Sequence, residues 1–178
     1  MQTYDEALDQ MASEVRRLRA SGATGDLSAL RRLDPKRPTA PALHRLLART
    51  VDEKLVGNMD MVARWARVAQ LMAMRPDDLR PESLGQVLVA LSFSEARLSA
   101  LLNAHGSTLR DLVSRTARRI AVSEEPLPYR SLCRLVLLDG RPEHEEAAEE
   151  LRIHISTKFQ RALRTQSNTQ QSTLEGRT

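Results

Sequence analysis

Apolar side chains recur at alternating spacings of three and four over most of the chain, which is the pattern of helices with one buried face. The first such run consists of Tyr4, Leu8, Met11, Val15 and Leu18. It predicts an amphipathic helix over residues 5–20. Between residues 60 and 75 apolar residues surround most of the helix circumference, which predicts a buried central helix containing Trp65, capped by Asp60.

The same spacing continues in the C-terminal half, where the alternation typical of strands is rare. The runs there are residues 84–91, 98–102, 109–120, 132–136 and 148–159. We therefore expect an all-α protein of about eight helices in two small packed bundles. A proline-bounded segment from Pro76 to Pro81 predicts a boundary between an N-terminal lobe, residues 1–76, and a C-terminal bundle, residues 77–165. Residues 166–178 lack a hydrophobic repeat and predict a disordered tail.

Residues 25–47 predict a compact helical corner with paired arginines on its outer edge. Three leucines recur every third residue from Leu27 to Leu33, and Asp34-Pro35 ends that run. Arg31 and Arg32 follow Leu30 directly, so rotations of about 100° per residue carry them away from the leucine face and toward solvent. Pro41 then opens a second helix.

The amino-acid composition indicates which kinds of molecule the chain is suited to bind. The chain has 178 residues, with 27 Lys and Arg against 23 Asp and Glu, and only 3% aromatic residues. Arginine supplies nearly all of the positive charge, because Lys36, Lys54 and Lys158 are the only lysines. Arginine suits bidentate contacts with phosphate, although exposed arginines are also ordinary on a helical surface.

Targeting signals and disulfides are not expected. Cys133 is the only cysteine, which excludes an internal disulfide, and its apolar neighbours place it in the core. The N-terminus is acidic and polar, unlike a signal peptide. No run approaches the roughly 18 consecutive apolar residues of a membrane span. We therefore expect a soluble, cytoplasmic protein that does not bind a membrane.

Catalytic chemistry finds little support in the sequence. The four histidines are scattered, and Glu150 and His154, four residues apart, have no second carboxylate–histidine pair with which to build a metal site. The seven glycines are isolated, so no glycine-rich phosphate loop is present. We expect no enzyme activity, no metal and no other cofactor.

Binding of nucleic-acid backbones agrees better with the charge pattern. Arginines lie at predicted helix edges and turns, where long cationic side chains reach phosphates without entering a groove. They are Arg31, Arg32, Arg97, Arg110, Arg115, Arg118, Arg119 and Arg141. With so few aromatic residues, the sequence offers no stacking platform for bases. A helical adaptor that binds only protein is the open alternative.

Two separated blocks resemble the CasB family, the small subunit of the Type I-E CRISPR surveillance complex Cascade. The first block is GDLSALRRLDPKRPTAPALHRLL, residues 25–47. The second comprises SFSEARLSALLNAHG, residues 92–106, followed by LPYRSLCRLVLLDG, residues 127–140. Both occur in the order and at the spacing of that family. The resemblance covers roughly residues 4–159 and leaves out the C-terminal tail.

The resemblance implies two helical bundles without enzymatic activity. It implies that two copies stack along the backbone subunits of a CRISPR RNA-guided complex, near its large subunit. There they would hold the guide–target region and guide the displaced strand of the target DNA, stabilising the R-loop in antiviral defence. Matching the family's basic positions gives six candidate nucleic-acid-binding residues: Arg31, Arg32, Arg97, Arg118, Arg119 and Arg141.

Overall fold

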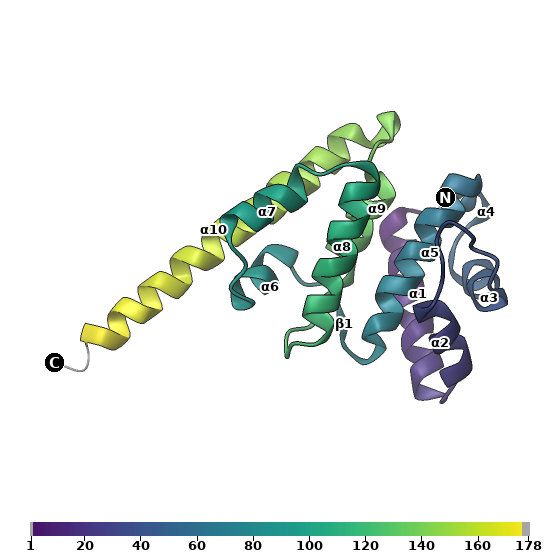
Figure 1. Cartoon of the computed structure of the whole chain (residues 1–178), viewed down its shortest axis with the longest axis horizontal. Coiled ribbons are helices and arrows are strands. Elements are labelled where there is room, and N and C mark those ends of the chain that lie inside the picture. Colours follow the sequence, from purple (N-terminus) through teal and green to yellow (C-terminus); the bar gives the residue numbers. More distant parts are fainter. Residues whose placement is uncertain (1, 176–178) are drawn as a thin grey trace.

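The chain folds almost entirely into helices, which confirms the predicted all-α class. The computed structural model describes residues 2–175, with side chains described through residue 168, and there it contains ten α-helices, two short 3-10 helices and one pair of two-residue strands (Figure 1). The helix count exceeds the expected eight partly because residues Glu53–Val56 form a separate single turn. The apolar spacing of the sequence did not predict that turn.

The N-terminal helices gather at one end of the molecule (Figure 1). They are α1 (Tyr4–Ala20), α2 (Thr24–Arg31), α3 (Pro41–Thr50), α4 (Glu53–Val56) and α5 (Met59–Met74). The central helix α5 buries Trp65 completely, as predicted, and the indole nitrogen donates to the Leu55 carbonyl at 3.0 Å. Its cap differs from the prediction. Asn58, and not Asp60, accepts the Met61 amide, because the helix begins one residue before Asp60.

The remaining elements follow a short proline-bounded connection. They are η1 (Pro76–Asp78), β1 (Leu79–Arg80), α6 (Leu84–Ala90), α7 (Glu95–Leu102), α8 (Gly106–Ala121), β2 (Leu127–Pro128), α9 (Tyr129–Leu138), η2 (Pro142–His144) and α10 (Glu145–Glu175). Strand β1 pairs in parallel with β2, with Leu79 opposite Leu127. This small ladder fixes the entry to α6 beside the entry to α9.

Buried side chains from both ends of the chain form one continuous core. Helix α9 lies between α8, α1 and α5 and contacts all three. Cys133 of α9 is fully buried, as expected, and this burial raises the pKa of its thiol. The proposed lobe boundary near residue 76 coincides with η1, but the core crosses it. The division into residues 1–76 and 77–165 therefore remains a prediction.

Helices α6 and α10 cross at unusually short range. A Cβ placed on Gly85 would lie 2.6 Å from the Phe159 backbone nitrogen and closer still to the Ile155 carbonyl oxygen. Glycine is therefore the one residue that allows these two backbones to approach this closely. This crossing attaches the long C-terminal helix to the rest of the fold.

Helix α10 extends well beyond the packed body (Figure 1). It continues to Glu175, so residues 166–175 are helical where the sequence predicted a disordered tail; residues 176–178 lie outside the described part. Phe159 is the last buried residue assigned to the core in this helix. Once packing has formed the first turns, each further residue adds a hydrogen bond without a new nucleation cost. None of the described helices is long and apolar enough to cross a membrane.

Candidate nucleic-acid interface

Helix α8 carries the largest group of arginines without acidic partners. Its inner face buries Leu109, Val113 and Ile120, so the helical period places Arg115, Arg118 and Arg119 on the exposed face. Within the described residues, none of the arginines of α8 forms an ion pair with a carboxylate. Their charge is available to an external anion. The α8 arginines are Arg110, Arg115, Arg118 and Arg119.

Arginines on the opposite part of the molecule are paired instead. Glu14 of α1 lies 2.6 Å from Arg17 and 2.7 Å from Arg49, and these two partners hold the pKa of its carboxyl at about 2. Arg45 lies 2.6 Å from Asp26. The small excess of positive charge is therefore not spread evenly, because carboxylates neutralise the α1–α3 side and leave the α8 side basic.

A basic cleft of about 240 Å³ lies between α8, α5 and the loop after α2. Lys36, Arg67 and Arg110 line it, together with the acidic residues Asp60 and Asp111. The Nε atom of Arg67 is buried without a hydrogen-bond partner, although its Nη1 donates to Gln70 at 3.0 Å. Leaving a buried donor unpaired is costly.

The charges around Arg67 also affect this cleft. Burial lowers the pKa of the Arg67 guanidinium, and the positive charges of Arg110 and Arg118 lower it further, while the carboxylates of Asp111 and Asp34 oppose them. The three guanidinium groups therefore repel one another across the α5–α8 junction, and the two carboxylates offset part of that repulsion. A bound phosphate would reduce that repulsion, which is the arrangement expected of a polyanion site.

The paired arginines of α2 join this region through direct contacts. The Nε atom of Arg31 donates to the Ala73 carbonyl of α5 at 2.6 Å, and Gln70 donates to the carbonyl oxygen of Arg31 at 3.1 Å. Arg31 and Arg32 are both exposed, as predicted, and the Arg32 side chain has no partner among the described residues. The α2 corner is thus fixed beside the C-terminal end of α5.

Helices α5 and α8 run parallel, which brings their C-terminal ends together. Arg75, just after α5, donates to the carbonyl oxygens of Ser123 and Glu125, just after α8. Arg118, near the end of α8, is therefore level with the end of α5 where Arg31 is bound. This alignment places the basic residues of α2 and α8 on either side of α5.

Beyond α8, a groove of about 270 Å³ separates it from α7. Arg97, Arg115 and Arg119 line this groove beside the Phe93 ring. The Arg119 guanidinium donates to the Leu91 carbonyl at 2.9 Å and lies 5.9 Å from the centroid of the Phe93 ring. The cation–π geometry holds one arginine in place while Arg97 and Arg115 lack hydrogen-bond partners for their side chains in the described structure.

These contacts define a basic track from α2 across α5 and α8 to α7. It contains five of the six residues that the sequence and its resemblance selected. The track comprises Arg31, Arg32, Lys36, Arg67, Arg110, Arg118, Arg115, Arg119 and Arg97. Four of them were not among the selected residues: Lys36, Arg67, Arg110 and Arg115. The signal in the sequence that marks Arg67 is its position on the polar edge of an otherwise apolar helix.

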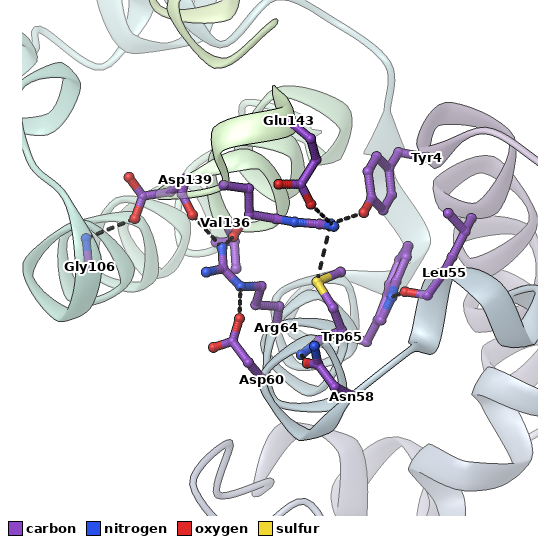
Figure 2. Close-up of polar contacts among 12 residues, drawn as sticks. Tyr4, Leu55, Asn58, Asp60, Arg64, Trp65, Gly106, Val136, Asp139 and Glu143 are labelled. Carbon is purple, nitrogen blue, oxygen red and sulfur yellow. Dashed lines mark hydrogen bonds and ion pairs between the residues drawn. The ribbon is translucent and has the colours of Figure 1, made fainter. Parts of the chain in front are cut away.

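Arg141 is the selected residue whose guanidinium group is held by partners within the fold. Its guanidinium donates to the Tyr4 hydroxyl, the Glu143 carboxylate and the sulfur of Met61 (Figure 2). Met61 and Ala73 are twelve residues apart on α5, which corresponds to about 18 Å along a helix. Arg141 therefore binds at the end of α5 opposite Arg31, and its contacts lie within the fold.

Asp139 connects the same region to the start of α8. Its buried carboxylate accepts from the Gly106 amide at 2.8 Å, and its carbonyl accepts from Arg64 at 2.7 Å (Figure 2). The carboxylate also accepts from Arg152 at 3.2 Å. A negative charge at a helix N-terminus stabilises it. This end of the molecule is consequently a structural junction that positions α8 relative to α5 and α10.

Replacing Arg141 by glutamine should lower stability without weakening nucleic-acid binding. The substitution removes charge-assisted bonds to Tyr4 and Glu143, so we expect the unfolding free energy to fall by about 1–2 kcal/mol. Urea denaturation measures this change. Affinity for a single-stranded oligonucleotide should stay within about twofold of the wild type, because Glu143 already pairs with this charge. A tenfold loss of affinity in a folded variant would show that Arg141 is part of the nucleic-acid interface.

Comparisons with known proteins add no independent assignment. No protein-family model, curated protein or solved structure matches the chain. Among the described residues, no group of three or more histidine, cysteine, aspartate or glutamate side chains is arranged to hold a metal ion. Function is therefore inferred from the basic track and from the residue blocks 25–47, 92–106 and 127–140.

Proposed function

We propose that the chain is a non-catalytic small subunit of a Type I-E CRISPR Cascade complex that binds nucleic-acid backbones and stabilises the R-loop. The observation that carries this proposal is the basic track, in which arginines from three separate regions of sequence lie together and form no ion pair with a carboxylate of the described residues. The two residue blocks resembling CasB, residues 25–47 and residues 92–106 with 127–140, contain Arg31, Arg32 and Arg97 of this track. The resemblance of these two blocks supports the assignment to Cascade in particular.

The physical role follows from the energetics of strand exchange. Replacing a DNA duplex by a guide–target heteroduplex is a nearly balanced exchange, so modest protein contacts with the strand backbones decide its direction. Arginines that bind the displaced strand oppose reannealing. Because such binding releases counterions, its strength falls steeply as the salt concentration rises. The partners in this proposal are the target DNA, the guide RNA complex with its backbone and large subunits, and a second copy of this chain.

The double substitution Arg31→Ala/Arg32→Ala tests this proposal within a reconstituted complex. It should shorten the dwell time of the complex on target DNA by about tenfold at low salt, because two phosphate contacts are lost. The variant Arg45→Ala/Arg49→Ala is the matched control, since it removes the same charge from arginines that carboxylates already neutralise. Circular dichroism verifies that both variants remain folded.

The alternative, a helical adaptor that binds only protein, predicts a different result. An adaptor would enter the complex normally, and the free protein would show no salt-dependent retention on single-stranded DNA. Unchanged dwell times for the Arg31/Arg32 variant over several salt concentrations, together with normal assembly, would contradict the proposed function and favour the adaptor.

A further inference from the structure

The groove between α7 and α8 combines an apolar floor with a cationic rim. Leu101, Leu112 and Phe93 provide apolar surface, while Arg97 from α7 and Arg115 and Arg119 from α8 surround it. Among the residues that the structure describes, none of those lining this groove is acidic. A groove of this kind fits a ligand that is flat and apolar in one part and negatively charged in the adjoining part.

We propose that this groove accepts an unpaired base of a single nucleic-acid strand, with the neighbouring phosphates held by the rim arginines. The Phe93 ring provides the aromatic surface that the low aromatic content of the sequence had argued against. The Arg119 guanidinium lies over this ring, 5.9 Å from its centroid, and its outer planar face extends the surface on which a base would stack. The groove volume of about 270 Å³ leaves room for a base beside these two side chains.

The chemistry of the groove favours a single strand over a duplex. In a duplex the base faces are stacked and paired, so only phosphates would reach the arginines and the apolar floor would remain in contact with water. An unpaired strand can place a base on the apolar floor and its phosphates against the arginines at the same time. The proposal rests on the proposed function and makes it more specific, because a site for unpaired bases distinguishes the displaced strand from reannealed DNA.

The test compares three probes against the full-length protein by fluorescence anisotropy: a short thymidine oligonucleotide, an abasic phosphodiester strand of equal length, and a duplex. The wild-type protein should bind the thymidine strand about tenfold more tightly than the abasic strand. Ala100→Met fills the groove from an exposed position on α7 and retains every arginine. It should abolish this tenfold preference while leaving affinity for the abasic strand unchanged.

Two further variants separate groove occupancy from general effects. Phe93→Leu keeps an apolar side chain against the core but removes the aromatic surface, and should also reduce the preference for bases. Ala48→Met adds the same side chain at an exposed position on α3, outside the groove, and should behave as the wild type.

The outcomes distinguish this inference from the proposed function. Equal affinity of the wild type for thymidine and abasic strands would overturn the base site while the backbone-binding function stands. Absence of binding to every probe would instead overturn the proposed function, and the base site with it. If Ala100→Met leaves oligonucleotide binding unchanged but prevents assembly with the protein subunits, the groove is a protein-binding site and the inference is wrong.

Discussion

Gly85→Ala is expected to lower the unfolding free energy by about 3 kcal/mol or more. The added methyl group would meet the α10 backbone at Ile155 and Phe159, and backbone atoms within a packed helix cannot rotate away as a side chain can. The contact between α6 and α10 must then open. Urea denaturation followed by circular dichroism measures the loss as a shift of the unfolding midpoint.

Gly25→Ala provides the matched control for this prediction. Gly25 lies in helix α2, where an added Cβ would meet no atom within 4 Å. Alanine should therefore stabilise the protein by about 0.5–1 kcal/mol, because it has the higher helix propensity. If Gly85→Ala unfolds at the same urea concentration as the wild type, the α6–α10 crossing is less close than described and the attachment of α10 needs another explanation.

The all-α class and the buried side of each helix could be predicted from the sequence, because the spacing of apolar residues within a segment identifies both. The spacing of three and four located Leu109, Val113 and Ile120 on one side of α8, so the exposure of Arg118 and Arg119 followed from rotation alone. The same argument placed Arg31 and Arg32 on the surface. Five of the six arginines selected from the sequence lie on the described track, and their binding to nucleic acid stays a prediction.

The arrangement of the helices depends on contacts between residues far apart in sequence, which periodicity does not contain. Arg75 bonds to carbonyl groups about fifty residues later and so sets α5 parallel to α8. Asp139 accepts the first amide of α8 from a position 33 residues further along the chain. Arg141 resembled its surface-exposed counterparts in sequence, but Tyr4, 137 residues away, binds it within the fold.

The strongest functional effect is expected from Arg115→Gln/Arg118→Gln, which removes two charges from the exposed face of α8. Glutamine has a helix propensity similar to that of arginine, and neither side chain has a partner among the described residues, so the fold should be unaffected. Affinity for a single-stranded oligonucleotide should fall by about ten- to a hundredfold at low salt. The dependence of log K on log salt concentration should become shallower by about 1.4, since each lost contact with a single strand contributes about 0.7.

The control Arg17→Gln/Arg45→Gln makes the same change in net charge on the side of α1 and α3, where Glu14 and Asp26 pair with the two arginines. If the protein attracted DNA only through its overall charge, both variants would lose affinity and slope equally. If the basic track is the binding surface, the Arg17→Gln/Arg45→Gln variant keeps nearly the wild-type dependence of log K on log salt concentration. The reason is that the carboxylates of Glu14 and Asp26 lie away from the bound strand. An equal loss in both variants would therefore contradict a localised interface, whichever complex the protein joins.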